Sequence, residues 1–282
     1  MQTHYQPSRL FNHDIFSNEE LKCLHEIAAA SPLEQLTSSA RWKEESAIDF
    51  VFTSAQIEGN TYSRADTISL LKIGKTANDK RYTDAVMIMN LRTAYDYILE
   101  NAHWVLTNPQ TEFLKYHSIL MQGLLPNDEL GKARTTKGTM IGGSSYVPLS
   151  GANLLGKELP ILFTELSKIE DPFAKAIYAS TNLSYLQYFE DGNKRTSRVF
   201  QNAVLMANNL APVLFPVAAI ADYIDATLVY YEQGDTLMSR AFMLEAYKQA
   251  YGDCSQEHPQ ISEVAADACG GDGRSGTSHP RG

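Results

Sequence analysis

Apolar residues recur at three- and four-residue intervals along most of the chain, a spacing that places them on one face of an α-helix. Between positions 80 and 102 they are Tyr82, Val86, Met89, Tyr95, Ile98 and Leu99. The same spacing predicts further helices over 158–168, 172–188, 194–209, 218–232 and 236–250. We therefore expect a mainly α fold, in which these apolar faces pack together as a bundle.

Helix boundaries are marked by residues that satisfy the free backbone groups at helix ends. Ser17 with Glu20 forms a capping-box pattern, which predicts that the first helix begins near residue 17. The segment 45–58 has a helical pattern and stops at Gly59-Asn60, two residue types that tolerate the left-handed conformation. These caps support helices independently of the apolar spacing.

Two segments break the helical pattern. Residues 131–151 are rich in Gly, Ser and Thr with a short β-prone alternation, which predicts a loop or a small β-hairpin. Residues 253–282 are too polar and glycine-rich to offset the entropy of ordering, so we expect a disordered tail. The expected organisation is an N-terminal helical region over 1–105, a core over 106–212, C-terminal helices over 213–252 and the tail.

Composition narrows the classes of partner. The chain has 282 residues and a formal net charge of -9, which argues against a surface that coats nucleic-acid phosphates or anionic lipid. Cys23, Cys254 and Cys269 lack the paired spacing of a zinc site, and their odd number does not make a disulfide framework. The first residues do not form a secretory leader pattern, and no apolar run reaches the roughly 20 residues of a membrane span. We expect a cytoplasmic protein with no nucleic-acid or membrane partner.

The stretch "YLQYFEDGNKRTSRVF", residues 185–200, concentrates charged residues between two helical patterns. Its centre is a tight turn before a helix that begins near Lys194, so unpaired N–H groups and the positive end of the helix dipole meet near Gly192. Arg195 and Arg198 are three positions apart, and Lys194 and Arg198 are four apart, so all three can lean over one site. This arrangement predicts a polyphosphate site.

Asp191, beside these cations, would be repelled by bare phosphate but suits Mg²⁺ that bridges phosphate oxygens. The plainer interpretation is a turn between two helices with a solvated cationic face. A β-hairpin is disfavoured, because the flanking residues have helical rather than alternating periodicity. A Walker A loop is excluded, because "GNKRTS" lacks its spacing.

The stretch resembles the signature of the Fic family, His-Pro-Phe-x-Asp/Glu-Gly-Asn-Gly/Lys-Arg-x-x-Arg. The matching residues are Phe189, Asp191, Gly192, Asn193, Lys194, Arg195 and Arg198. "TSAQIEGN" resembles the family's inhibitory helix, here about 45–60, with Ser54 and Glu58 in register. "MIGGSSYVP", Met140 to Pro148, resembles the β-hairpin flap that holds a target segment over the nucleotide.

The resemblance implies a Fic-type helical bundle with a short β-hairpin flap, which binds ATP with Mg²⁺ and transfers AMP to a Ser, Thr or Tyr hydroxyl of a protein target. By the same resemblance Asp191 would hold the metal, and Asn193 and Arg195 would share the catalytic site with it. Gly192, Asn193 and Lys194 would line the anion cradle, and Arg195 and Arg198 would bind the outer phosphates. The nucleotide motif would span residues 187–198.

The resemblance also implies regulation and target binding. Glu58 would pair with Arg198 and keep the γ-phosphate from seating, because a carboxylate competes for the donors that a phosphate needs. Ile141, Gly142 and Gly143 would expose backbone groups with which a target strand can pair.

The sequence departs from the signature at the position of its histidine, which is Gln187, and Tyr188 replaces the proline. Histidine can take up the proton of a target hydroxyl near neutral pH, whereas glutamine does not titrate. Loss of a general base costs about 10²- to 10⁴-fold in rate. We assign Gln187 to the catalytic position, where its amide can orient a hydroxyl. His117, on an otherwise apolar helix, is expected to be a packed core residue rather than a substitute base.

Two alternatives to AMP transfer remain open at this point. Without the histidine, the chain could be a catalytically impaired nucleotide-binding regulator that acts through a partner. Lys194 in place of the second signature glycine resembles the Doc branch of the family, which transfers phosphate rather than AMP. The sequence leaves the target, the oligomeric state and the role of the C-terminal helices open.

Overall fold

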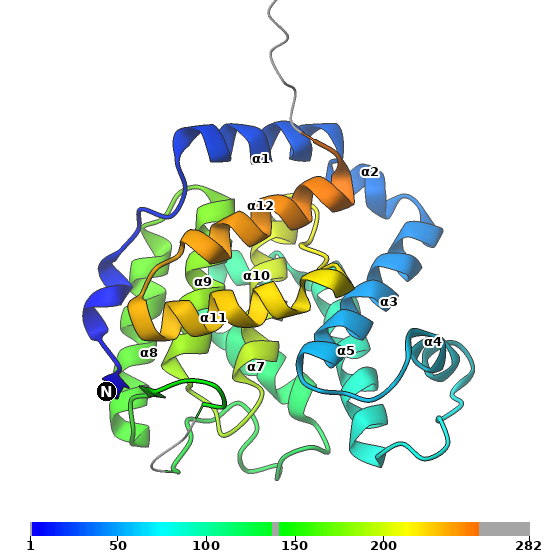
Figure 1. Ribbon diagram of the computed structural model, residues 1–282, viewed down its shortest axis with the longest axis horizontal. Coiled ribbons are helices and arrows are strands. Elements are labelled where there is room, and N and C mark those ends of the chain that lie inside the picture. The colour runs from blue at the N-terminus through cyan, green and yellow to red at the C-terminus, as the bar shows by residue number, and fades with distance from the viewer. Residues whose placement is uncertain (1, 137–140, 254–282) are drawn as a thin grey trace, which may run out of the picture.

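Helices make up nearly all of the regular structure in the computed structural model, which describes residues 2–136 and 141–253 (Figure 1). The expected mainly α fold is confirmed. The α-helices are α1 (Asn18–Ala30), α2 (Leu33–Thr37), α3 (Ala40–Ile57), α4 (Arg64–Ile73), α5 (Tyr82–Asn101), α6 (Trp104–Thr107), α7 (Pro109–Met121), α8 (Ala152–Ser167), α9 (Pro172–Leu186), α10 (Asn193–Ala207), α11 (Ile220–Gln233) and α12 (Leu237–Tyr251). Two 3₁₀ helices, η1 (Pro7–Phe11) and η2 (Val217–Ala219), and two strands, β1 (Thr3–His4) and β2 (Tyr146–Val147), complete the regular structure of the described residues.

The centre of the bundle is the pair α9 and α10, which pack against each other and are joined by the turn 187–192. Nearly every residue of α10 is buried, including Arg195 and Arg198. On one side α10 contacts α5, α6 and α7, while α11 packs on α9 and α3 and also contacts α12 (Figure 1). The turn that carries the predicted nucleotide motif therefore lies between the two most enclosed helices.

Local capping chemistry explains where the early helices begin and end. The Ser17 hydroxyl accepts from the Glu20 N–H at 3.2 Å, and the Ser17 N–H donates to the Glu20 carboxylate at 2.8 Å, which confirms the predicted capping box. α3 begins earlier than its apolar pattern predicted, because Ser39 caps it at the Trp42 N–H. It ends before Gly59, which adopts φ 76° as expected.

The segment 131–151 makes its only strand pairing, among described residues, with the N-terminus of the chain. Thr3 lies opposite Tyr146 and His4 opposite Val147 in a two-stranded parallel sheet. Such a pairing between distant segments leaves no local pattern in the sequence. Met140 and the rest of 137–140 lie outside the described residues, and so does the predicted disordered tail apart from Asp253.

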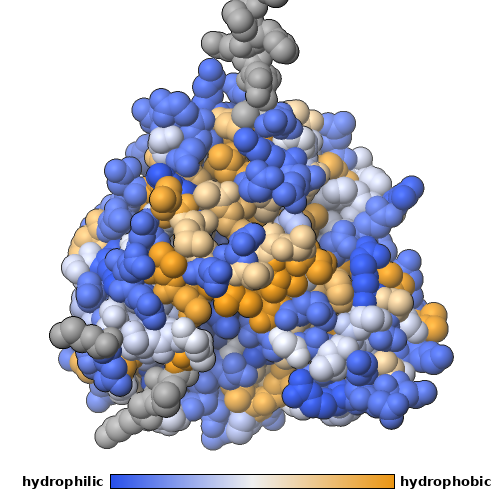
Figure 2. Space-filling model, in the orientation of Figure 1, coloured by the Kyte–Doolittle hydropathy of each residue, from blue (hydrophilic) through white to orange (hydrophobic). Residues whose placement is uncertain are grey.

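Apolar side chains gather on the face shown in Figure 2, over α11, α12 and the segment before them. The exposed members include Val217, Ile224, Leu237 and Met238. No helix among the described residues combines the length and the apolarity that a membrane span requires. Cys23 of α1 takes part in a disulfide.

Asn202 of α10 ties the segment after that helix to the core and gives a test of the fold. Its amide donates to the Val213 carbonyl at 3.1 Å and accepts from the Val213 N–H at 2.9 Å, both in a buried setting. The substitution Asn202→Ala should lower the free energy of unfolding by about 2 to 4 kcal/mol, because two buried backbone groups lose their partners. Urea denaturation measures this loss, and Asn208→Ala at the end of α10 should cost less than half as much. Equal losses of stability in the two variants would show that the hydrogen bonds between Asn202 and Val213 do not have this special weight.

Candidate functional site

The turn between α9 and α10 is built by three residues with special backbone roles. Gln187 ends α9 in the left-handed conformation, with φ 49° and ψ 52°. Gly192 has φ 76°, and a Cβ there would lie 2.6 Å from the Met121 sulfur, so a side chain does not fit. Asn193 closes the turn, because its side chain accepts from the Phe189 N–H at 2.8 Å and donates to the Phe189 carbonyl at 2.9 Å.

The first turn of α10 presents unpaired N–H groups. Gly192 is the N-cap and has no side chain that could cap the helix. The Thr196 N–H makes the first intrahelical hydrogen bond, to the Gly192 carbonyl at 2.9 Å. The N–H groups of residues 193–195 precede that bond and have no intrahelical acceptor. Together with the helix dipole they form a cradle suited to an anion, as the sequence predicts.

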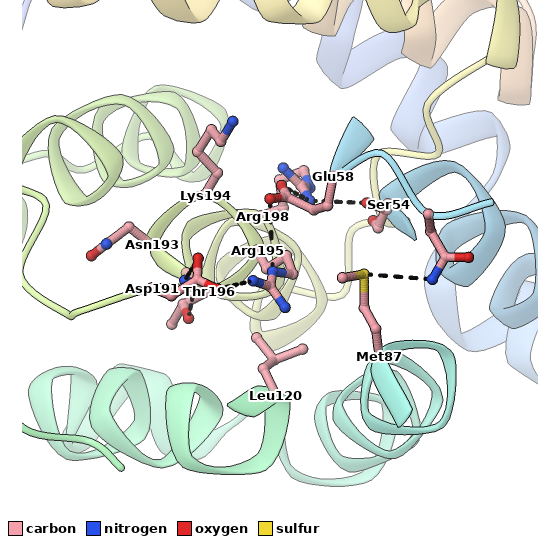
Figure 3. A network of polar contacts seen from close by, with 12 residues as sticks. Ser54, Glu58, Met87, Leu120, Asp191, Asn193, Lys194, Arg195, Thr196 and Arg198 are labelled. Carbon is pink, nitrogen blue, oxygen red and sulfur yellow. Dashed lines mark hydrogen bonds and ion pairs between the residues drawn. The ribbon is translucent and has the colours of Figure 1, made fainter. Parts of the chain in front are cut away.

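Arg195 and Arg198 lie on the same side of α10 and converge on Glu58, the residue that follows α3 (Figure 3). An Nη2 atom of Arg198 lies 2.9 Å from the Glu58 Oε1, and the Nε of Arg195 lies 3.8 Å from the Glu58 Oε2. The Arg198 side chain is 0% exposed and that of Arg195 is 4% exposed. Two buried guanidinium groups therefore share one carboxylate.

Charge decides the protonation state of Glu58. Burial alone would raise the pKa of this carboxyl, but the charges of Arg198, Arg195 and Lys194 outweigh burial and lower the pKa below its ordinary value. Ser54, one turn earlier in α3, adds its carbonyl as a second acceptor for Arg198 at 3.3 Å. Its hydroxyl is buried and has no hydrogen-bond partner among the described residues. The end of α3 therefore provides Arg198 with a carboxylate and a carbonyl.

Asp191 lies at the mouth of this arrangement, with 63% of its side chain exposed. One carboxylate oxygen lies 2.9 Å from Nη2 of Arg195, and the other accepts from the Gly192 N–H at 2.6 Å. No group of three or more metal-ligating side chains occurs among the described residues. This donor set fits Mg²⁺, which takes one or two protein carboxylates and completes its shell with phosphate and water. Asp191 would hold it.

Both polar atoms of the Gln187 side chain and its backbone carbonyl are hydrogen-bonded. Its amide nitrogen donates to the Ser184 carbonyl at 2.7 Å and lies 3.3 Å from the Tyr231 hydroxyl. Its amide oxygen accepts from Asn193 at 3.3 Å. Its backbone carbonyl accepts from the Arg134 Nε at 2.6 Å. The glutamine thus locks the turn, and a hydroxyl that it oriented would have to replace one of these partners.

His117 has the packed position that its apolar helix predicts. Its Nδ1 accepts from the Gly131 N–H at 2.9 Å, so the proton lies on Nε2, which donates to the Asp191 carbonyl at 3.1 Å. The ring stacks on Phe189 with 3.6 Å between the centroids. Burial lowers the pKa of His117 to about 4, which keeps the imidazole neutral at physiological pH. Both nitrogens are engaged, so His117 supports the turn and offers no free base.

Three residues that contact the site were not assigned a role from the sequence. The Tyr223 hydroxyl in α11 lies 3.3 Å from Nη1 of Arg198, and Tyr231 of the same helix contacts Gln187. Arg134 donates to the carbonyls of Gln187, Thr136 and Leu149, which ties the segment 131–151 to the turn. The amphipathic pattern predicts α11 but cannot show which face meets α10.

The predicted flap residues lie beside α11, where the Ser144 hydroxyl donates to the Glu232 carboxylate at 2.9 Å. The Ser144 N–H donates to the Ile141 carbonyl at 3.2 Å and closes a turn in which Gly143 has φ 78°. Gly142 and Gly143 are exposed. Their backbone groups are accessible, and the pairing of a target strand with them stays a prediction.

Comparison with known proteins agrees with the motif. Residues 107–205 match the model of the Fic/DOC family. The chain is 26% identical over 208 residues to "Protein adenylyltransferase fic-1" of Caenorhabditis briggsae, covering 72% of this chain and 40% of that protein. It is 26% identical over 257 residues to "Protein adenylyltransferase Fic" of Drosophila persimilis, covering 89% and 49%. The chain thus spans about half the length, or less, of these relatives.

Solved structures share the fold. Fic-1 of Caenorhabditis elegans superposes with a TM-score of 0.68 at 21% identity, covering 83% of this chain and 69% of that one. A Fic family protein of Desulfovibrio desulfuricans gives a TM-score of 0.66 at 19% identity, covering 88% and 75%. The resemblance to the Fic family and the expected helical fold are both confirmed, and the inhibitory helix at 45–60 stays a prediction.

Replacement of Glu58 tests how much stability depends on its ion pair. Glu58→Gln should lower the free energy of unfolding by about 3 kcal/mol at pH 7, because Arg198 stays buried and charged without its partner. Because folding lowers the Glu58 pKa, its contribution is complete above the ordinary pKa of about 4.3 and is lost as pH falls through the folded-state pKa. In Glu58→Gln the free energy of unfolding should lack this part of its dependence on pH.

Urea denaturation between pH 7 and pH 3 measures both effects. The matched control is Glu45→Gln, which removes the exposed pair with Arg41 and should cost less than about 1 kcal/mol. If the two variants lost equal stability, the Glu58 pair would have no special weight in the fold.

Proposed function

Because the chain carries a Fic/DOC domain over residues 107–205, we propose that it binds ATP with Mg²⁺ and transfers AMP to a hydroxyl of a protein target. The observation that carries the proposal is the convergence of Arg195 and Arg198 beside the open N-terminus of α10. The names of relatives that match 72% and 89% of this chain support the reaction type. Those relatives are about twice as long, so the activity of the whole protein is part of the proposal.

Each residue of the site has a role that follows from its position. The amides of residues 193–195 bind phosphate oxygens, since they have no acceptor in the helix. Arg195 and Arg198 bind the outer phosphates, where planar guanidinium groups suit paired oxygens. Asp191 would hold Mg²⁺, which would neutralise phosphate charge when bound. Exposed Gly142 and Gly143 offer the backbone with which the target segment pairs.

The reaction exchanges one bond to the α-phosphorus for another. The target oxygen attacks that phosphorus, the bond to the bridging oxygen breaks, and pyrophosphate leaves. The hydroxyl proton passes to solvent water, because Gln187 cannot titrate. Transfer therefore relies on positioning and charge neutralisation, which contribute most of the catalysis in phosphoryl-transfer enzymes.

Self-inhibition by Glu58 belongs to the same proposal. Its carboxylate holds the Arg198 donor that a γ-phosphate needs, at 2.9 Å. Ser54 supports this state through its carbonyl. ATP must displace the carboxylate to reach Arg198, and the displaced Glu58 would then face phosphate of like charge.

A nucleotide-binding regulator without turnover is the second candidate. The observation that favours it is the fully bonded side chain of Gln187, which neither titrates nor points free into the site. Phosphotransfer is the third, and it rests on Lys194 at the position where the Doc branch departs from the rest of the family. The three candidates differ in whether a phosphate is transferred and, if so, in which one.

Labelled ATP separates the three candidates. With Glu58→Gly protein and a cell lysate, α-labelled ATP should label a protein band and γ-labelled ATP should not. Arg198→Ala in the same background should abolish the label, because the outer phosphates lose their buried donor. Label from the γ-phosphate alone would establish phosphotransfer. Calorimetric ATP binding with no label from either position would establish the regulator.

Restoration of the signature histidine tests the proton requirement. Gln187→His should raise the initial rate of AMP transfer by about 10²- to 10⁴-fold in the Glu58→Gly background. The left-handed backbone at residue 187 tolerates histidine, which occurs there more often than most residues. Rates at pH 5.5 to 8 should also acquire a dependence on one titrating group near pH 6.5. An unchanged rate would show that proton uptake does not limit transfer.

A further inference from the structure

The Glu58 side chain is held in place by the turn that follows it. The Gly59 N–H donates to the Gln56 carbonyl at 2.9 Å, and the Asn60 N–H donates to the Ala55 carbonyl at 3.0 Å. These two bonds form the Schellman arrangement that closes a helix. Since Glu58 is the last residue before this turn, loosening the turn frays the end of α3 that carries the carboxylate.

Asp84, at the start of α5, anchors this turn. Its side chain is only 2% exposed. One carboxylate oxygen accepts from the Thr61 hydroxyl at 2.8 Å and from the Thr61 N–H at 3.3 Å. The other lies 2.9 Å from Nη2 of Arg81. A buried carboxylate is costly unless it is paired and hydrogen-bonded, and here Thr61 and Arg81 supply those partners.

Asn60 links the same two elements a second time. Its amide donates to the Asp84 backbone carbonyl at 2.9 Å and contacts the Met87 sulfur at 3.7 Å. Gln56, in the last turn of α3, donates to the carbonyls of Asn60 and Tyr62, each at 2.9 Å. The end of α3, the turn and α5 thus form one continuous hydrogen-bonded unit.

We infer that Asp84 is a positioning residue for Glu58, which holds the end of α3 so that the carboxylate stays on Arg198. The inference rests on the proposed self-inhibition and extends it to a residue that touches neither arginine. The hydroxyl and N–H of Thr61 lose their acceptor when the Asp84 carboxylate is removed. The last turn of α3 then opens more often, and Arg198 becomes available to phosphate for a larger fraction of the time.

Calorimetry with Mg·ATP on four full-length chains tests the inference: the parent, Asp84→Ala, Glu58→Gly and the double variant. Asp84→Ala alone should tighten Kd by about five-fold, the lower end of ordinary coupling between linked sites. Glu58→Gly should tighten Kd by at least as much. In the double variant Asp84→Ala should add no further change, because its effect passes through Glu58.

Two controls separate positioning from general loss of stability. Asp84→Asn keeps an oxygen that can accept from Thr61 and should leave Kd within about two-fold of the parent. Asp96→Ala removes an exposed acid further along α5, paired with Arg92, and should leave Kd unchanged. Amide hydrogen exchange at residues 58–62 should accelerate in Asp84→Ala and not in Asp96→Ala.

The outcomes distinguish this inference from the proposal beneath it. If Glu58→Gly tightens Kd and Asp84→Ala only lowers the melting temperature, Asp84 is structural and the inference fails alone. If Asp84→Ala tightens Kd equally with and without Glu58, the residue acts by another route and the inference also fails. If Glu58→Gly leaves Kd unchanged, self-inhibition through Arg198 is wrong, and the inference falls with it.

Discussion

The charge on Arg198 must be matched inside the protein, and this requirement organises the site. Its side chain is fully enclosed between α3, α10 and α11, so the guanidinium cannot rely on water. An unpaired buried charge costs several kcal/mol, whereas a carboxylate or a phosphate can bind the same donors. The ion pair with Glu58 meets this requirement in the structure, and under the proposed function a nucleotide phosphate would meet it once ATP is bound. Competition between two anions for one cation would then give the site two states.

Hydrogen bonds fix the turn that precedes α10, the helix that carries Arg195 and Arg198. The polar side-chain atoms around the turn are hydrogen-bonded to backbone and side-chain partners, and they belong to Gln187, Asn193 and His117. Arg134 donates to the carbonyls of Gln187 and Leu149, which ties the segment 131–151 to the turn. These contacts hold the turn in place although the signature histidine is replaced. Under the proposed function, binding and transfer can then be separated, since binding needs only this hydrogen-bonded turn whereas transfer needs a proton acceptor.

Many of the helix ends and the shared face of the two arginines could be predicted from the sequence, because they depend on interactions between residues close together in the chain. The capping residues Ser17 and Glu20 and the glycine at position 59 act on their immediate neighbours, so their patterns predicted helix ends correctly. The spacing of Arg195 and Arg198 predicted one shared face because a helix has fixed geometry. Tyr223, Arg134 and the pairing of Thr3 with Tyr146 escaped prediction, because each contact joins segments distant in the chain. The flap interaction, the inhibitory role of Glu58 and the domain limits stay predictions.

The central claim is that one buried arginine exchanges Glu58 for a nucleotide phosphate. A crystal structure of the Glu58→Gly chain with Mg·ATP tests it most directly. The account predicts outer-phosphate oxygens about 3 Å from Arg198 and Arg195, with the phosphate chain resting on the amides of residues 193–195. Nucleotide bound away from the N-terminus of α10, or Arg198 paired with another protein group while ATP is bound, would contradict it.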